Sequence, residues 1–200
     1  FIGIGATASR YAGIEGENSS NVHLAMDLLT GIQKKNLGNK NSDFIDVKDK
    51  KVLVIGGGDT AMDCVRSSVR EGASSVKCLY RRNEANMPGS KKEVVNAKEE
   101  GVEFVFNVSP KVIKTDGNIA TGVELLTTSM SEPDDSGRQK VVINEGSEYL
   151  EEADIIIMAL GFSPEAPAFL KELNVETNSW GGIEISKTFQ TSNNKVYAGG

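Results

Sequence analysis

Apolar runs alternate with amphipathic stretches through the middle of the chain. Residues 52–55 are four consecutive aliphatic positions, a pattern typical of a strand buried on both faces. Three glycines follow, and from about Asp59 the apolar positions recur at helical spacing on one face: Ala61, Met62, Val65 and Val69. Gly72 ends this helix, and residues 76–80 form a second apolar strand. The pattern predicts a β-α-β unit with a glycine turn between its first strand and its helix.

The same patterns continue beyond this unit. Ser90 is the expected N-cap of a helix over 91–100, which Gly101 ends, and 102–106 is the expected third parallel strand. Residues 154–160 form another strand buried on both faces, which ends at Gly161. Between them, β segments at 111–115, 122–129 and 139–144 are separated by turn residues, with a polar loop over 131–138. We therefore expect an α/β, Rossmann-like three-layer fold with a parallel sheet and an inserted antiparallel β-meander.

The flanking segments carry weaker patterns. Asn21 is the expected N-cap of a helix over 22–34, whose apolar face comprises Val22, Ala25, Met26 and Leu29. His23, the only histidine, would lie in the first turn of this helix without an acidic or nucleophilic partner, so we expect it to have no catalytic role. Residues 36–50 are a polar loop, 168–173 a short helix and 183–185 a short strand.

The glycine turn suits a diphosphate. Gly56 permits a tight turn, Gly58 permits close approach of an anion, and Ala61 is the small third position of G-x-G-x-x-(G/A). Unpaired N–H groups and the helix dipole would face a pyrophosphate. A glycine turn can also be purely structural. The complete order of strand, turn, helix, glycine and strand favours a dinucleotide site.

The residues at the end of the second strand indicate which dinucleotide the site binds. NAD and FAD sites usually carry Asp or Glu about 20 residues after the glycines, where it accepts hydrogen bonds from ribose hydroxyls. This chain has Arg81 and Arg82 there instead. Two guanidinium groups can bind a ribose 2′-phosphate bidentately, so NADP(H) is the predicted ligand. The alternative is a pair of solvated surface arginines.

Composition narrows the function classes. The 200 residues carry a net charge of −6, which argues against a nucleic-acid partner. The local cluster of Arg81, Arg82, Lys91 and Lys92 suits a small anion better. The sequence contains no apolar run of about 18 residues and no signal peptide, so we expect neither a membrane partner nor secretion. Cys64 and Cys78 lie in apolar elements outside any C-x-x-C motif, which indicates reduced core thiols in a cytoplasmic protein.

Several of these motifs together resemble one family. GGGDTAMDC at 56–64 and LYRRNEANMPGSKKEV at 79–94 resemble the NADPH-binding domain of glutamate synthase small (beta) subunits and related flavin modules. The resemblance also covers FIGIGA at 1–6, VHLAMDLL at 22–29, MALGFSP at 158–164 and VYAGG at 196–200. NEANMPGS is its most specific part.

The resemblance implies an NADPH domain inserted into an FAD domain, with hydride passing from NADPH to flavin. Residues 1–21 and 187–200 would then belong to the FAD domain and its linker, and 22–186 to the NADPH domain. A start in mid-strand without Met suggests a fragment of a longer flavoprotein, so we expect FAD only in that parent. The parent would also have an electron-accepting subunit or domain as a partner.

The resemblance also places a turn beside the nicotinamide, at Ala159, Leu160 and Gly161. Asp59 either caps its own helix, pointing away from the phosphates, or touches a ribose or nicotinamide group. No catalytic residue or metal ligand is expected, because hydride transfer depends on position. The predicted cofactor-binding residues are Gly56, Gly57, Gly58, Asp59, Thr60, Ala61, Arg81, Arg82, Ala159, Leu160 and Gly161.

Two other functions stay open. A thioredoxin-reductase-like module shares the glycine turn and the arginine pair, but it would carry a C-x-x-C motif shortly before the first strand, where residues 30–50 contain no cysteine. A nucleotide-sensing domain without a redox role would show the same binding motifs. Only the flavin response of the intact parent would separate that domain from an oxidoreductase.

Overall fold

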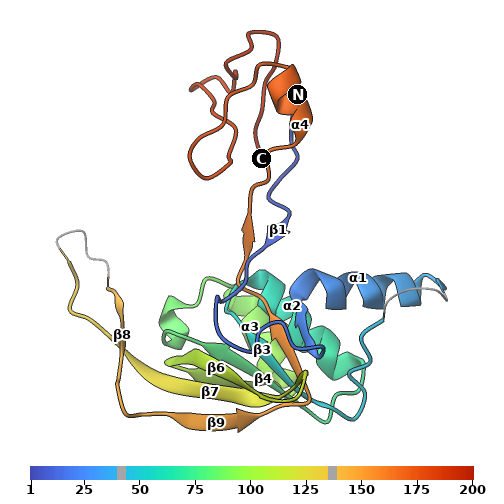
Figure 1. Ribbon diagram of the computed structural model, residues 1–200, viewed down its shortest axis with the longest axis vertical. Coiled ribbons are helices and arrows are strands. Elements are labelled where there is room, and N and C mark those ends of the chain that lie inside the picture. The colour runs from blue at the N-terminus through green and yellow to red at the C-terminus, as the bar shows by residue number, and fades with distance from the viewer. Residues whose placement is uncertain (40–43, 135–138) are drawn as a thin grey trace. The chain divides into compact units, whose positions relative to one another are not determined.

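A computed structural model describes residues 1–39, 44–134 and 139–200 (Figure 1). Residues 40–43 and 135–138, within the predicted loops 36–50 and 131–138, lie outside the described residues. Contacts divide the chain into two compact units. The larger unit is Tyr11–Gly161, and the smaller one combines Phe1–Arg10 with Phe162–Gly200.

A parallel sheet forms the centre of the larger unit. Its strands, in spatial order, are β2 (Val22–Leu24), β10 (Ile155–Met158), β3 (Lys51–Ile55), β4 (Ser75–Tyr80) and β5 (Glu103–Phe106). Every residue from Val52 to Ile55 and from Ile155 to Met158 is buried, because layers cover both faces of the sheet. This confirms the predicted parallel sheet, and the structure places β3 in its middle.

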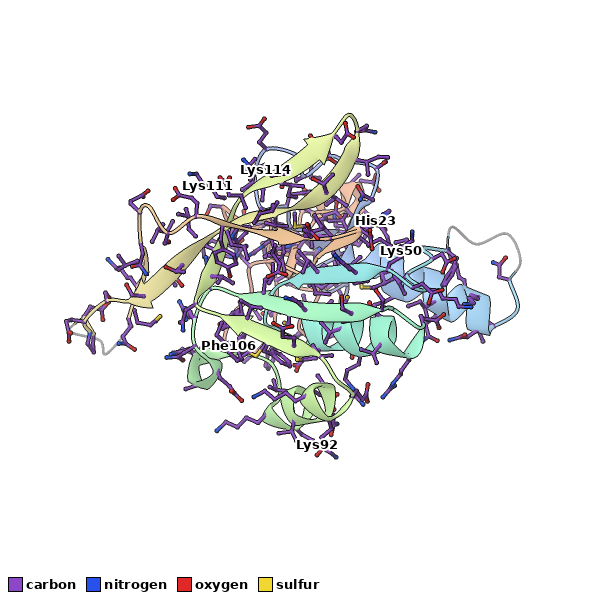
Figure 2. The ribbon with its side chains drawn as sticks, turned by 90° about the horizontal axis from the view of Figure 1, so that it is seen from below. His23, Lys50, Lys92, Phe106, Lys111 and Lys114 are labelled. Carbon is purple, nitrogen blue, oxygen red and sulfur yellow. The ribbon has the colours of Figure 1, made fainter. Side chains whose placement is uncertain are left out.

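Helices cover one face of this sheet and antiparallel strands cover the other (Figure 2). The helices are α1 (Ala25–Asn36), α2 (Asp59–Arg70) and α3 (Lys91–Glu99). The antiparallel strands are β6 (Val108–Asp116), β7 (Ile119–Met130), β8 (Val141–Ile143) and β9 (Tyr149–Glu152). Alternate strand residues point to opposite layers: Val52 and Val54 pack with the helices, while Leu53 and Ile55 pack with the antiparallel strands. The predicted three-layer α/β fold is confirmed.

The predicted helix over 22–34 is wrong at its start. Residues Val22–Leu24 form strand β2, which pairs with β10, and the helix begins at Ala25. Asn21 is therefore no N-cap; its side chain donates to Asp154 O at 2.7 Å and accepts from the Ala120 N–H at 2.7 Å. The buried helix positions also differ from the expected apolar face, since Met26 is exposed: they are Ala25, Leu28, Gly31 and Ile32.

The meander is longer than its pattern indicated. The segments expected at 111–115 and 122–129 are parts of the long antiparallel pair β6 and β7. The segment expected at 139–144 contains the shorter β8, which pairs with the end of β7. Strand β9 was not predicted; it pairs with Gly122–Leu125 of β7. Its alternating exposure is weak, because Tyr149 and Leu150 are both exposed.

The smaller unit has little regular structure. Strand β1 (Ala8–Ser9) pairs with β11 (Phe162–Ser163), and α4 (Ala168–Glu172) matches the predicted short helix within one residue. The strand predicted at 183–185 is reduced to a single bridge between Thr177 and Ile183. By their contacts the units part after Arg10 and Gly161, whereas the domain boundaries expected from the sequence were at residues 21 and 186. Residues after 161 stay with the smaller unit through contacts such as Asn193 Nδ2 to Leu173 O, at 2.7 Å.

Candidate functional site

Beyond β3 in the sequence, strands are added to the sheet first on one side of β3 and later on the other side. After β3 the chain passes through α2 to β4 and then through α3 to β5, whereas β10, on the other side of β3, follows only after the meander. The carboxyl ends of β3 and β10 thus border a topological switch point, where open α/β sheets bind ligands. The glycine turn, residues 56–58, lies at this point.

The three glycines of the turn have different surroundings. Gly56 has φ +150°, and an added Cβ would lie 2.2 Å from Ala159 O. At Gly57 a Cβ would lie 2.5 Å from the Tyr80 ring, whereas at Gly58 it would meet nothing within 4 Å. The first two positions therefore require glycine for the fold. The third is open on its side-chain side.

Helix α2 begins directly at this open position. Gly58 is its N-cap, with extended backbone and no side-chain cap. Among the residues that the structure describes, the N–H groups of Asp59 and Thr60 have no side-chain acceptor. Ala61 is completely buried in the core between helix and sheet, as the motif predicted. An uncapped helix N-terminus reached through an open glycine can accept an anion.

The two arginines follow β4, on the neighbouring strand. Thr128 Oγ1 donates to Arg81 O at 3.0 Å, and the Asn107 N–H donates to Arg82 O at 3.1 Å. Both carbonyls are thus held by the end of β5 and by β7. Among the described residues neither guanidinium pairs with a carboxylate, and Arg82 Nε is buried without a hydrogen-bond partner. A buried, unsatisfied donor on a cation is suited to an anionic ligand.

Segment 83–90 packs back on the glycine turn. It contains a 3₁₀ turn, Glu84–Asn86, and the Tyr80 hydroxyl donates to Asn86 O at 2.8 Å. The Gly89 N–H donates to Gly57 O at 3.0 Å. The sequence predicted no contact for this segment, although NEANMPGS is the most specific part of the family resemblance. The Pro88-Gly89 pair marks the turn, but only the fold brings it to Gly57.

Asp59 belongs to this contact set. Its Oδ1 accepts a hydrogen bond from the Ser90 N–H at 2.7 Å. Of the two alternatives for Asp59, capping of its own helix is wrong, since the cap residue of α2 is Gly58. The other alternative, a contact with a ribose or nicotinamide group, stays a prediction. Ser90 does stand at the N-cap of α3, but its side chain makes no capping hydrogen bond, contrary to the prediction.

The residues after β10 pack against the glycine turn. The Ala159 N–H donates to Ile55 O at 2.9 Å, and Ala159 is buried. Leu160 is partly buried against the core beneath the meander, and Gly161 has φ +83°. Ala159 is thus brought directly against Gly56. A nicotinamide contact for Ala159, Leu160 and Gly161 stays a prediction.

Other candidate chemistry lies elsewhere. Cys64 and Cys78 are free and buried, and burial raises the pKa of each thiol to about 12, so neither is a ready nucleophile. His23 lies on strand β2 beside a hollow of about 750 Å³, and burial lowers its pKa, opposed by Asp27. No cluster of His, Cys, Asp and Glu in the part of the chain that the structure describes could hold a metal ion. Over the same residues, no helix is long and apolar enough to span a membrane.

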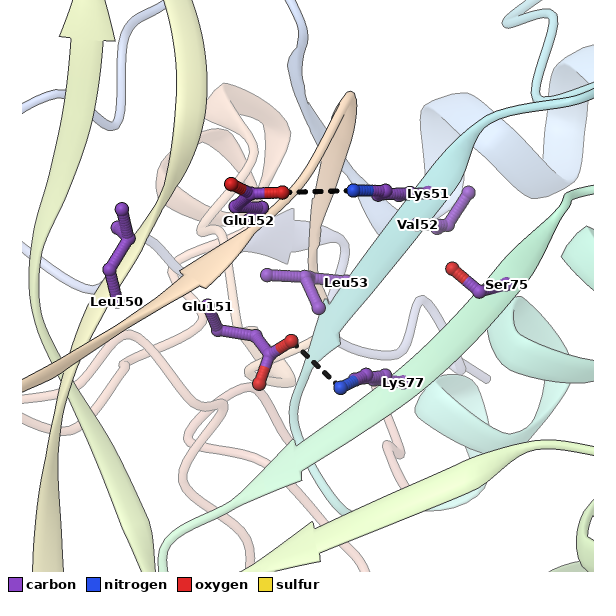
Figure 3. A pocket seen from close by; sticks show the side chains of 8 residues that line it. All are labelled: Lys51, Val52, Leu53, Ser75, Lys77, Leu150, Glu151 and Glu152. Carbon is purple, nitrogen blue, oxygen red and sulfur yellow. Dashed lines mark hydrogen bonds and ion pairs between the residues drawn. The ribbon is translucent and has the colours of Figure 1, made fainter.

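A second hollow, of about 380 Å³, lies at the amino ends of β3 and β4 (Figure 3). Its charged groups form ion pairs, Lys51 with Glu152 at 2.9 Å and Lys77 with Glu151 at 2.8 Å. The hydrogen bonds that Lys51 and Lys77 donate to Glu152 and Glu151 raise the pKa values of the two lysines. Because this hollow is at the opposite end of the strands from the glycine turn, it is no part of the candidate site.

Curated proteins similar to this chain are oxidoreductases by name. It is 46% identical over 208 residues to "Glutamate synthase [NADPH] small chain" of Escherichia coli K12, covering 100% of this chain and 44% of that protein. It is 44% identical over 209 residues to "Putative oxidoreductase AegA" of the same organism, covering 100% of this chain and 32% of that protein. The chain thus spans less than half the length of these relatives.

Solved structures share its fold. Thioredoxin reductase of T. acidophilum matches 99% of this chain and 55% of its own, with a TM-score of 0.68 at 21% identity. FprA of Mycobacterium tuberculosis in complex with NADPH matches 92% of this chain and 55% of its own, with a TM-score of 0.69 at 17% identity. The model of the family described as pyridine nucleotide-disulphide oxidoreductase matches residues 1–200. This chain belongs to the pyridine nucleotide-disulphide oxidoreductase family.

Proposed function

We propose that Tyr11–Gly161 is the NADPH-binding domain of a longer FAD-dependent oxidoreductase similar to glutamate synthase small chains. In that parent the domain holds the nicotinamide against the flavin. The rest of the parent supplies FAD and an electron-accepting subunit or domain. Two buried, unpaired cysteines fit a reducing compartment, and we propose a cytoplasmic location.

One observation carries the binding role. In the turn at the switch point, contacts fix Gly56 and Gly57, while Gly58 is open and leads into an uncapped helix. A purely structural turn has no need of an open third glycine, because any residue can adopt the extended backbone of Gly58. Close approach of a ligand explains the glycine there.

The arginines support NADPH over NADH. The two nucleotides differ by the 2′-phosphate of the adenosine ribose, and β4 ends where that ribose lies in a Rossmann-type arrangement. Arg81 is exposed, while the Nε atom of Arg82 is buried without a partner among the described residues. A phosphate would pair with both guanidinium groups and satisfy the buried donor.

In this mechanism the chain binds and positions NADPH, and none of its side chains needs to act as an acid or a base. NADPH supplies a hydride, which a flavin in the parent would accept. The chain's own residues bind the pyrophosphate at the turn, hold the 2′-phosphate through Arg81 and Arg82, and place the nicotinamide beyond the end of β10. Positioning is therefore the contribution that we assign to Gly58, Arg81 and Arg82.

Two alternatives can be distinguished from this proposal. A thioredoxin-reductase-like module needs a redox dithiol, but Cys64 and Cys78 are buried and make no disulfide. A sensing domain would bind NADPH without reducing a flavin. Adding NADPH to the intact parent and following flavin absorbance separates the two: bleaching supports the oxidoreductase, and an unchanged flavin spectrum supports the sensor.

Calorimetry tests the binding role in the chain itself. NADPH titrated into the protein should bind saturably and more tightly than NADH. Absence of saturable binding, or equal affinity for both nucleotides, would contradict the proposal.

A further inference from the structure

We propose that Asp59 is a positioning residue, whose carboxylate clamps segment 83–90 to the glycine turn and thereby sets the direction of an anion-binding N–H group. The inference deepens the proposed function and rests on it. Asp59 does not need to touch the nucleotide.

Two adjacent hydrogen bonds make the clamp. Asp59 Oδ1 accepts from the Ser90 N–H at 2.7 Å, and Gly57 O accepts from the Gly89 N–H at 3.0 Å. Successive residues of the segment are thus tied to the two residues that flank Gly58. Gly89 permits the close approach, since a Cβ there would lie 3.1 Å from Gly57 O.

The second hydrogen bond has a geometric consequence at the turn. The Gly57 carbonyl and the Gly58 N–H belong to one trans peptide, so they point in opposite directions. Holding the carbonyl toward Gly89 therefore holds the Gly58 N–H away from the segment. That N–H is the first of the helix-start donors that we assign to the pyrophosphate. The clamp orients this donor before the ligand arrives, which lowers the ordering cost of binding.

The clamp also explains an acid beside an anion site. A carboxylate in the first turn of α2 is near the place where a phosphate binds. Its contact with Ser90 holds it at the start of α3, a helix whose N-cap side chain makes no capping hydrogen bond. A negative charge is favourable at a helix N-terminus. Asp59 therefore stabilises the entrance to α3.

Asp59→Ala tests the inference, because clamping and repulsion predict opposite changes in nucleotide affinity. If Asp59 only repelled phosphate, its removal would tighten binding. Loss of the clamp should instead weaken NADPH and NADH alike, by about three- to tenfold for one charge-assisted hydrogen bond near water. Amide exchange at Gly89 and Ser90, followed by NMR in nucleotide-free protein, should become faster. Asp63→Ala is the matched control, since it removes an exposed acid one turn further along α2. It should change neither the nucleotide affinity nor the amide exchange at Gly89 and Ser90.

Ser90→Pro removes the donor and keeps the carboxylate. Ser90 has φ −54°, which proline can adopt, and its carbonyl stays available to the Val94 N–H. We expect the same loss of affinity as in Asp59→Ala, and a double variant no weaker than the single ones, because both remove one interaction.

Unchanged or tighter nucleotide binding in Asp59→Ala, or unchanged exchange at Gly89 and Ser90, would overturn the inference. Additive losses in the double variant would overturn it too. If wild type failed to bind NADPH, the proposed function and the positioning role would both fall. The exchange experiment needs no nucleotide, so it still reports whether the clamp exists.

Discussion

At the scale of residues, Gly58 differs from its two neighbours in the free protein. A side chain at Gly58 meets open space, whereas one at Gly56 meets the Ala159 carbonyl. Gly58→Val should therefore leave the fold intact and weaken NADPH by at least about tenfold, because its side chain occupies the space of the pyrophosphate. Calorimetry measures the affinity, and circular dichroism measures the fold.

Gly56→Val is the contrasting variant. Its Cβ would lie 2.2 Å from backbone oxygen, at a φ of +150° that L residues rarely adopt. We expect a large fall in the melting temperature, unlike the result for Gly58→Val. Normal nucleotide affinity in Gly58→Val would show that the turn is structural.

The sequence was sufficient to place the glycine turn and the two arginines after their strands, because they lie within one local β-α-β pattern; their role in binding stays a proposal. It was not sufficient for the contacts of Asp59 or Gly57. Their partners, Ser90 and Gly89, lie about thirty residues away and carry no periodic signal. The open surroundings of Gly58 also depend on tertiary packing.

At the scale of elements, an ion-pair cluster joins α2 to the end of α3. Glu100 Oε1 accepts from Arg66 Nη2 and Arg70 Nη2, both at 2.7 Å, and Arg66 also pairs with Glu93. Hydrogen bonds from Arg66 and then Arg70 lower the pKa of Glu100 to about 2. The cluster thus fixes the two helices whose starts meet at Asp59 and Ser90.

The stability that this cluster contributes should depend on pH, and Glu100→Gln should remove that dependence. A lowered pKa in the folded state stabilises the protein above the unfolded pKa of about 4.5, and this stabilisation is lost as pH falls through about 2. Near pH 6 the variant should be less stable by about 1–2 kcal/mol, a discounted value because water screens a partly exposed site. Near pH 3 the stability difference between wild type and Glu100→Gln should be less than half of its value near pH 6. Urea unfolding followed by circular dichroism measures it.

Glu99→Gln is the control for this experiment, because Glu99 is an exposed neighbour. Its stability relative to wild type should stay nearly constant with pH. A wild-type advantage over Glu100→Gln that did not shrink on acidification would contradict the assigned ionisation.

The elements that sequence reasoning placed wrongly are those fixed by distant partners. Val22–Leu24 fits helical spacing, yet its pairing with β10 makes it a strand. Strand β9 lacks clear alternation because it is a half-exposed edge next to β7. By contrast, α2 and strands β3, β4 and β10 have strong local patterns, and all were predicted within one or two residues.

At the scale of the whole molecule, the chain corresponds to 44% or less of the two Escherichia coli relatives described above. It contains one glycine turn that opens a helix, which we assign to NADPH; Gly3, Gly5 and Ala8 match the same spacing, but among the described residues they lead into strand β1 and no helix, so we expect no FAD diphosphate site there. The purified chain should therefore be colourless and should not take up added FAD. Absorbance near 450 nm after gel filtration is the measurement, and stoichiometric flavin in the protein peak would contradict the assignment.

The central claim is that Arg81 and Arg82 recognise a 2′-phosphate. A paired titration of NADPH and NADH against wild type and Arg81→Ala/Arg82→Ala, at low and high salt, tests it most directly. The double variant should lose about ten- to a hundredfold or more in NADPH affinity, because one charge-assisted hydrogen bond contributes about 1.5–3 kcal/mol and partial exposure to water reduces what the two arginines add together. It should lose much less in NADH affinity. Salt should reduce the wild-type preference by screening. Equal weakening of both nucleotides, or equal affinity in wild type, would contradict the account.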